Sequence, residues 1–176
     1  NLVGKLPEGV YARDLILTII GEVGANGCNY QVMEFTGEGA KTLSISDRMA
    51  LCNMAVEAGA KTGIFEADEK AIEYLKEHGR EPKEIFHSDP DAKYVREYTF
   101  DLSKVRPVVA KPDFVDRVVP AEETCGTPIN EAFLGSCNNG RIEISASAQR
   151  SSAERKSQRA SVSSLFRQAR RSTARH

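Results

Sequence analysis

The chain contains 176 residues, which is enough for one ordinary domain or for parts of two. Hydrophobic residues make up 40% of it, which favours a folded core over a disordered chain. No run of about 18 apolar residues occurs, so the sequence predicts no membrane span. The opening Asn1–Gly4 has neither a basic segment nor a cleavage site, so it predicts no signal peptide.

Charge divides the chain into two compositional segments. The net charge is −1, but residues 1–143 carry 16 Lys and Arg against 24 Asp and Glu, a balance of −8. Residues 144–176 carry eight basic residues and one acidic residue, a balance of +7. The last 33 residues therefore follow a different compositional rule from the rest.

Helices and strands alternate along the first half of the chain. Apolar residues at helical spacing predict a helix over residues 12–21, ended by Gly21. The elements predicted next are a strand at 30–36 ending in a Gly37/Gly39 loop, a helix from Ser44 or Ser46 to Ala58, a strand at 62–66 and an exposed helix at 68–78. The spacing Gly21, Gly24 and Gly27 follows a helix and precedes a strand, so it predicts a turn and no dinucleotide site.

The second half is less regular. A polar loop is predicted at 79–93, short extended segments at 98–101 and 107–110, a surface crossing at 112–123 and a strand over 129–134. Strands alternating with helices indicate an α/β layered fold. We expect one α/β unit over residues 1–95, the start of a second over 96–143, and a basic, disordered tail over 144–176.

Two polar residues of the second predicted helix are candidates for chemistry. Asn53 and Glu57 are four residues apart, so they stand on one side of a helix. Their neighbours are apolar or small, so we expect a partly buried side on which the amide and the carboxylate need partners. The alternative is a polar stripe that faces solvent.

The four cysteines, Cys28, Cys52, Cys125 and Cys137, form no CxxC pair. Without an export signal disulfides are unexpected, so we place the chain in a reducing cytoplasm. A lone cysteine is more often a small buried hydrophobe than a ligand. Cys137 differs because it follows a predicted strand, in a turn of small and amide residues whose N–H groups favour the thiolate that iron–sulfur clusters require. An ordinary tight turn is the alternative.

Five stretches form a recognisable series over residues 1–143. They are, in chain order, Ala12-x-Asp14-Leu15-Ile16-Leu17; Met33-Glu34-Phe35-Thr36-Gly37-Glu38; Leu43-Ser44-Ile45-x-Asp47-Arg48-Met49 with Cys52-Asn53-Met54-Ala55-x-Glu57-Ala58-Gly59-Ala60-Lys61; Asp101-Leu102-Ser103-Lys104; and Gly135-Ser136-Cys137-x-Asn139-Gly140-Arg141-Ile142-Glu143. The series closely resembles the large subunits of isopropylmalate dehydratases and homoaconitases, within the aconitase family. The resemblance implies an aconitase-type layered α/β fold.

The resemblance also implies a function. It is a hydro-lyase reaction of leucine biosynthesis, in which water leaves 2-isopropylmalate and is added back to give 3-isopropylmalate. In the family a [4Fe-4S] cluster is held by three cysteines, of which Cys137 matches the first. Asn53 and Glu57 match residues that hydrogen-bond the hydroxyl at the cluster, and Asn139 and Arg141 match substrate-binding positions. A small swivelling subunit is the implied partner and supplies a catalytic serine.

The sequence also departs from the family pattern. No CxxC provides the other two cluster ligands, the histidine-bearing segments are absent, and Asn138 stands where the family commonly has threonine. We therefore expect an internal piece of a large subunit that is inactive by itself. Homoaconitase and a methylmalate-type dehydratase remain alternatives, because the family's substrate-selecting loop lies in a segment that this chain lacks.

The tail after Glu143 lies outside the resemblance. Its nine Ser and eight basic residues fit a nucleic-acid-binding protein, although Phe166 is its one stacking aromatic. A non-catalytic interaction protein is a further alternative. One nucleotide removed from a set of synonymous codons for the family's helix yields the residues 143–152 found here. We therefore predict that residues 144–176 are a frameshift product.

Overall fold

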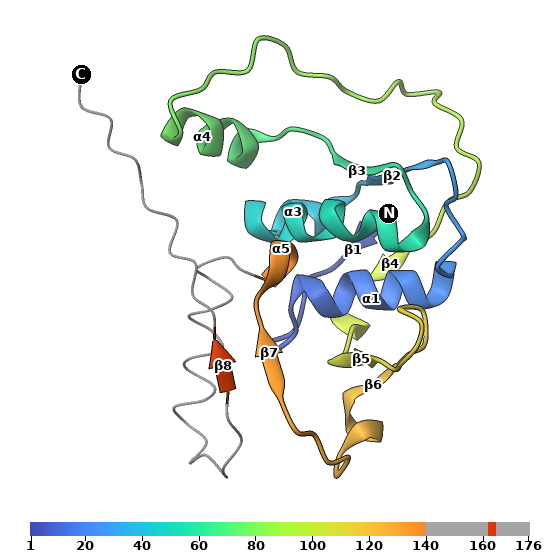
Figure 1. The fold of residues 1–176 in the computed structure, drawn as a ribbon. Coiled ribbons are helices and arrows are strands. Elements are labelled where there is room, and N and C mark those ends of the chain that lie inside the picture. The colour runs from blue at the N-terminus through green and yellow to red at the C-terminus, as the bar shows by residue number, and fades with distance from the viewer. Residues whose placement is uncertain (140–161, 165–176) are drawn as a thin grey trace. The chain divides into compact units, whose positions relative to one another are not determined.

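The computed structural model describes residues 1–139 and 162–164, and the chain divides into two compact units, Asn1–Cys125 and Gly126–His176 (Figure 1). The first unit has, in order, β1 (Leu2–Val3), α1 (Ala12–Val23), β2 (Val32–Phe35), α2 (Glu38–Thr42), α3 (Ile45–Met54), the 3₁₀-helix η1 (Ala55–Ala58), β3 (Thr62–Phe65), α4 (Glu69–Glu77), β4 (Phe100–Asp101), η2 (Leu102–Lys104), β5 (Val108–Ala110), β6 (Val118–Pro120) and η3 (Ala121–Thr124). The second has β7 (Ala132–Leu134), α5 (Ser136–Asn139) and β8 (Val162–Ser164).

The strands pair in twos, mostly in parallel. Strands β2 and β3 are parallel, with Met33 opposite Gly63 and Phe35 opposite Phe65, and α2 and α3 form the crossover between them. Strands β1 and β4 are also parallel, whereas β5 and β6 are antiparallel. A parallel pair joined by a helical crossover is the unit from which α/β folds are built, so the expected fold class is confirmed.

Helix α1 contributes more buried residues to the described core than any other single element. Its apolar residues Leu15, Ile16, Ile19 and Ile20 are all buried, as their spacing predicts. The helix continues through Gly21 to Val23 and ends at Gly24, where φ is 87°. A Cβ at Gly21 would lie 3.0 Å from the Cβ of Val118, so glycine at this position lets β6 approach the helix. The predicted end at Gly21 was wrong because that glycine serves packing.

Helix α3 begins and ends on capping groups that the sequence indicated. The Oγ of Ser44 accepts the N–H of Asp47 at 3.1 Å, and the carboxylate of Asp47 accepts the N–H of Ser44 at 3.0 Å. Ser44 is therefore the cap, rather than Ser46. The predicted helix to Ala58 changes to the 3₁₀-helix η1 at Ala55 and stops at Gly59, which has a φ of 82°.

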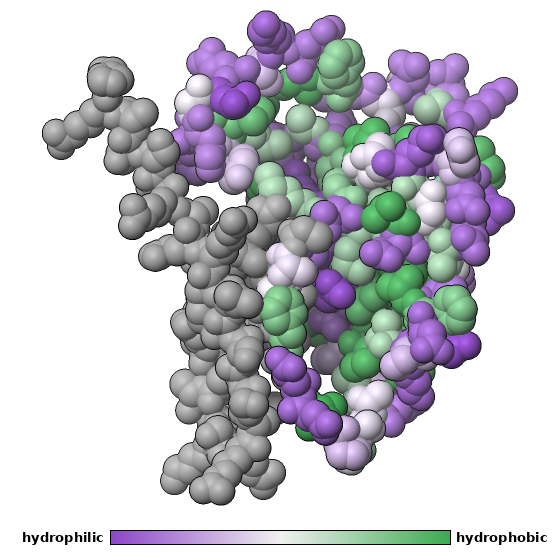
Figure 2. All heavy atoms as spheres, viewed as in Figure 1, coloured by the Kyte–Doolittle hydropathy of each residue, from purple (hydrophilic) through white to green (hydrophobic). Residues whose placement is uncertain are grey.

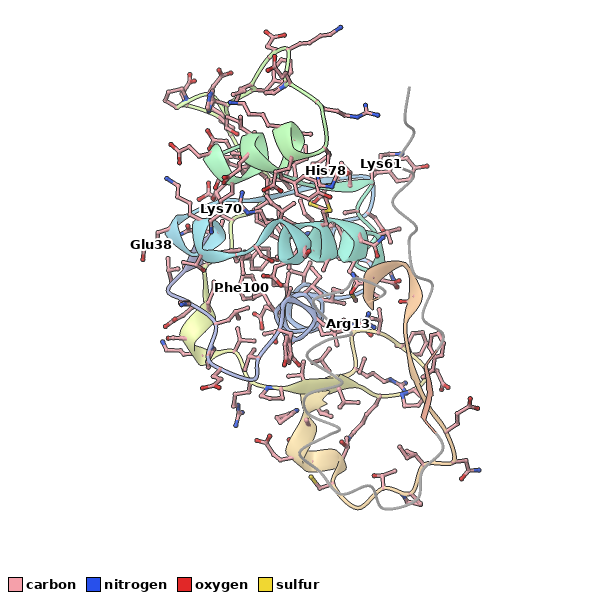
Figure 3. All side chains as sticks on the ribbon, turned by 90° about the vertical axis from the view of Figure 1, so that its left-hand side faces the viewer. Arg13, Glu38, Lys61, Lys70, His78 and Phe100 are labelled. Atoms are coloured by element: carbon pink, nitrogen blue, oxygen red, sulfur yellow. The ribbon has the colours of Figure 1, made fainter. Side chains whose placement is uncertain are left out.

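A single carboxylate ties α3 to α4. Asp68 accepts two hydrogen bonds from the guanidinium of Arg48, at 2.8 and 2.6 Å, and also caps α4 by accepting the N–H of Ala71 at 3.2 Å. The Arg48 side chain is only 7% exposed and that of Asp68 is 23% exposed. Figure 3 shows Lys70, which extends from α4. Its Nζ donates to the carbonyl oxygens of Lys41 in α2 and of Leu43 just after it.

The structure differs from the sequence analysis in several short elements and in one unit boundary. Strands β1 and β6 and helix α2 were not predicted, because elements of two to five residues leave no periodicity to detect. The expected boundary near residue 95 differs from the observed division after Cys125. Residues beyond 95 belong to the first core, since β4 pairs with β1 and the N–H of Val108 donates to the Asp14 carboxylate at 3.0 Å.

The second unit is small in its described part. Strand β7 pairs in parallel with β8, and α5 follows β7 directly. The predictions made for residues 144–161 and 165–176, including their origin by frameshift, lie outside the described residues.

The described surface mixes polar and apolar side chains. Among the residues that the structure places, no helix is long and apolar enough to cross a membrane. On the face shown in Figure 2, hydrophobic residues reach the surface in the middle, and polar residues gather above them, towards the top.

Replacing Asp68 by Asn will lower the free energy of unfolding by about 2 kcal/mol, because a buried guanidinium loses its counter-charge while the helix cap is kept. Chemical denaturation followed by circular dichroism measures the change. Glu122→Gln is the matched control, since the pair of Arg106 and Glu122 is 66% and 60% exposed and is worth about 0.5 kcal/mol or less. Equal losses in the two variants would show that the Arg48–Asp68 pair has no special role.

The same pair makes stability depend on pH in a defined direction. The hydrogen bond from Arg48 is the main reason that the pKa of Asp68 lies below its ordinary value of 3.8. A carboxyl whose pKa is lower in the folded state stabilises the protein above its unfolded pKa and loses this contribution as the pH falls through the folded value. The stability difference between the native chain and Asp68→Asn will therefore be constant near neutral pH and shrink below the ordinary pKa. A difference that grows in acid would contradict this assignment.

Candidate active site

The predicted Asn53–Glu57 pair lies where α3 passes into η1. Asn53, Val56 and Glu57 are exposed, whereas Met54 and Ala55 are buried against the core. The two polar residues therefore share the outward side, as their spacing predicted. The expectation that this side is partly buried was wrong, because α1 and β3 cover only the opposite side of the helix.

The exposed residues Asn53, Val56 and Glu57 form a surface that we call the ridge. A loop over residues 28–31 runs beside the ridge and is hydrogen-bonded to the residues that follow it. The N–H of Cys28 donates to the carbonyl oxygen of Ala58 at 2.9 Å, and the N–H of Lys61 donates to that of Gln31 at 2.9 Å. Gly59 lies so close to this loop that a Cβ there would be 2.0 Å from Oδ1 of Asn29. Glycine at 59 is thus required both by its positive φ and by the loop that it touches.

The loop also carries an aromatic residue, whose contact with a lysine the sequence did not predict. Tyr30 has a φ of 62°, which is uncommon for an aromatic residue, and is 85% exposed. The Nζ of Lys61 lies 4.2 Å from the centre of its ring, in a cation–π contact. The sequence predicted Tyr30 to be the first residue of a strand. Gly27 and Asn29, shortly before it, were the nearest signs of a turn. An exposed aromatic ring on this loop therefore contacts a lysine that lies just before β3.

The expected cluster cysteine belongs to the second unit. Cys137 is the second residue of α5, which follows β7, so its predicted place beyond a strand end is confirmed, whereas the predicted turn is a short helix. Ser136, just before it, has a φ of 88°, a conformation rare outside glycine. Asn138 is buried, Asn139 is the last residue of α5, and Arg141 lies outside the described residues.

Cys28 and Cys52 are poor metal ligands. Burial raises the pKa of the Cys28 thiol, an effect that the nearby Arg96 partly opposes, and burial raises the pKa of Cys52 as well. A raised pKa disfavours the thiolate that a metal needs. Among the described residues, no three His, Cys, Asp or Glu side chains are grouped to hold a metal ion. The residues described therefore do not by themselves fit a [4Fe-4S] cluster, which takes several thiolates.

A small crevice marks the carboxyl ends of β2 and β3, where α/β folds commonly bind ligands. It has a volume of about 140 Å³ and is lined by residues at the ends of the two strands, Phe35–Gly37 and Phe65–Asp68, by Ala40 and Lys41 of α2, and by Arg48 of α3. The guanidinium of Arg48 is occupied by Asp68, although its Nε has no protein partner. The buried guanidinium in this crevice is accordingly part of an ion pair.

Comparison with known proteins connects these features to one family. The family model described as "Aconitase family (aconitate hydratase)" matches residues 1–128. The chain is 49% identical over 143 residues to 3-isopropylmalate dehydratase large subunit 1 of Methanopyrus kandleri, covering 81% of this chain and 34% of that protein. It is 50% identical over 139 residues to the probable 3-isopropylmalate dehydratase large subunit of Methanothermobacter thermautotrophicus, covering 79% of this chain and 33% of that protein.

A probable methanogen homoaconitase large subunit of Methanosarcina mazei is 46% identical over 140 residues, covering 80% of this chain and 36% of that protein. The chain therefore spans about a third of the length of the curated relatives that it matches. The family match covers most of the residues that the structure describes, including β2, α3 and β3. The chain belongs to the aconitase family.

Proposed function

We propose that this chain is part of the large subunit of a 3-isopropylmalate dehydratase, which interconverts 2-isopropylmalate and 3-isopropylmalate by removing and adding water. The observation that carries the proposal is its identity of 48 to 50% with large subunits of that name from three organisms. The reaction is a step of leucine biosynthesis, and a cytoplasmic location belongs to the same proposal.

Asn53 and Glu57 are the residues that we propose for the chemistry. An amide can donate and accept hydrogen bonds and a carboxylate can accept a proton, which are the two abilities needed to orient a hydroxyl group and manage its proton. Their exposed position on α3 and η1 supports this role, because a substrate can reach them without any movement of the core.

Cys137, Asn139 and Arg141 complete the proposal. Cys137 would be one thiolate ligand of the [4Fe-4S] cluster that the intact family members carry, and Asn139 and Arg141 would contact the substrate. The sequence has no CxxC that could provide the other two ligands, so they would come from polypeptide outside these residues. When bound, the cluster supplies a Lewis acid for the leaving hydroxyl. A small subunit would be the partner.

A homoaconitase is the second candidate function. Two relatives called probable methanogen homoaconitase large subunits are 46% and 48% identical, nearly as similar as the dehydratases. The two reactions would use the same hydroxyl chemistry and differ in the substrate side chain, so the residues of the ridge serve either one.

A chimera tests the function. In the Methanopyrus kandleri large subunit, the 143 matched residues are exchanged for those of this chain, and the protein is assayed with its own small subunit. We expect turnover of isopropylmalate, and a decrease in kcat of about 100-fold or more for Glu57→Gln, because a general acid–base group contributes about 10²–10⁴. Asn53→Ala will also lower kcat, and the absorbance of the cluster will be unchanged.

Val56→Ala is the matched control, since Val56 is exposed on the same ridge but has no group that exchanges protons. Its kcat will stay within a few-fold of the unaltered chimera. Full activity of Glu57→Gln would reject the proposed role of that residue. Turnover of homoaconitate in preference to isopropylmalate would replace the proposed substrate with that of the second candidate.

The 176-residue chain alone, purified under reducing conditions and mixed with a dehydratase small subunit, will not convert isopropylmalate. The reason is that Cys137 is its one expected cluster ligand. Absorbance of iron–sulfur clusters after reconstitution and formation of isopropylmaleate are the measurements. A stable cluster with measurable turnover would show that this chain holds a complete ligand set.

A further inference from the structure

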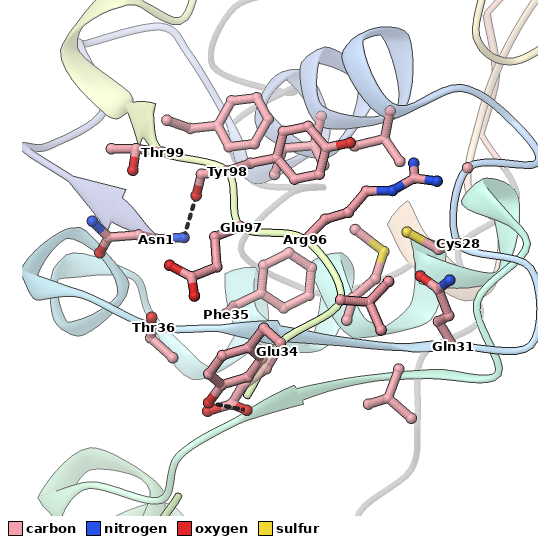
Figure 4. A pocket seen from close by; sticks show the side chains of 18 of the residues that line it. Asn1, Cys28, Gln31, Glu34, Phe35, Thr36, Arg96, Glu97, Tyr98 and Thr99 are labelled. Atoms are coloured by element: carbon pink, nitrogen blue, oxygen red, sulfur yellow. Dashed lines mark hydrogen bonds between the residues drawn. The ribbon is translucent and has the colours of Figure 1, made fainter. Parts of the chain in front are cut away.

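A hollow of about 600 Å³ opens beside strand β2 in the first unit (Figure 4). One wall is the strand with its flanking residues, 31–36, and the other is the segment 93–100. Ile19 and Val23 of α1 line it with apolar groups. Charged residues of both signs, including Glu34 and Arg96, border it, so it shows no preference for an anion or a cation.

The hollow adjoins a strand edge that is only partly occupied among the described residues: the N–H of Leu2 donates to the carbonyl oxygen of Thr36 at 2.8 Å, just past the end of β2, whereas residues 32–35 have no backbone partner on that side. Strand β2 pairs with β3 on one side, and the residues that line the hollow include all of β2 and none of β3. No backbone hydrogen bond crosses from residues 32–35 to residues 93–97 within the described part of the chain. Backbone groups at such an edge are a template for pairing with another strand.

The outer face of the same sheet is also incompletely covered. Val32 is 52% and Ile64 is 48% exposed on this face, where Glu34 stands opposite Ile64. A strap formed by residues 87–94 crosses it, held where Ser88 and Tyr94 donate to the Glu34 carboxylate at 2.6 and 3.0 Å. Parallel sheets are normally covered on both faces and contain more than two strands. The β2–β3 pair is therefore only part of a sheet.

We propose that this hollow receives a β-strand from the part of an aconitase-family large subunit that lies outside the region shared with this chain. The matched relatives are about three times as long as the region shared with this chain, so most of their polypeptide lies outside that region. The strand would pair with the free edge of β2 and place apolar side chains on Ile19 and Val23. A chain of this kind fits better than a small ligand, because the free polar groups of the wall are backbone groups at strand spacing.

Fragment complementation tests the proposal. The parts of the Methanopyrus kandleri large subunit that precede and follow its 143 matched residues are produced as two separate polypeptides and mixed with the 176-residue chain. We expect one of them to form a complex with it. Amide hydrogen exchange will slow at residues 31–36 and 93–97 in that complex.

The cysteines provide a built-in comparison. Cys28 lines the hollow, whereas Cys125 is exposed and lies away from it. Maleimide labelling, resolved by mass spectrometry of the peptides, will slow at least 10-fold at Cys28 on complex formation and stay unchanged at Cys125. Val23→Arg, which places a charge in the apolar lining, will weaken the complex at least 10-fold. Val109→Arg, at a partly exposed residue of β5, is the control and will not.

Three outcomes would overturn the proposal. The first is a complex that leaves exchange at residues 31–36 and labelling of Cys28 unchanged. The second is protection of Cys28 in the chain alone at rising concentration, which would show that a second copy fills the hollow. The third is binding by a Val23→Arg variant, shown to be folded by circular dichroism, that is as tight as binding by the native chain. These measurements do not depend on enzyme activity, so they stand apart from the test of the proposed function.

Discussion

The close contact of helix α3 with strand β3 sets the geometry of the first unit. A Cβ at Gly63 would lie 2.8 Å from Cα of Cys52, so the helix rests on the strand only because residue 63 has no side chain. This contact, with α1 on the same side, buries Leu51 and Met54 and turns Asn53 and Glu57 outward. The exposure of the proposed catalytic residues thus follows directly from how the opposite side of their helix is packed.

Electrostatics reinforces the same arrangement. Arg48 lies on α3, before Asn53, and its side chain is buried. A buried guanidinium is tolerated only with a partner. Asp68 meets that need and also caps α4, so one carboxylate fixes two helices against the end of β3. Protonation of Asp68 removes the charge that serves both roles, so the stability of this region decreases in acid.

The sheets of the first unit are pairs, whereas parallel sheets are stable as larger, covered assemblies. The free edge of β2, the apolar hollow beside it and the exposed Val32 and Ile64 are consequences of that incompleteness. They belong with the length of the matched relatives, which is about three times that of the shared region. The open sheet edge and the greater length of the matched relatives together support the proposal that this unit packs against more polypeptide.

Local sequence determined the longer elements of this protein. Apolar spacing specified α1, the Ser44–Asp47 pair specified the start of α3, and a series of motifs specified the family before any coordinates, because each of these signals acts within a few residues. Tertiary structure alone decided that Gly21 packs against Val118 instead of ending a helix, that residues beyond 95 join the first core, and that Asn53 and Glu57 are exposed. Those outcomes depend on contacts between segments far apart in the chain, and no local pattern encodes which side of a helix its distant partners will cover.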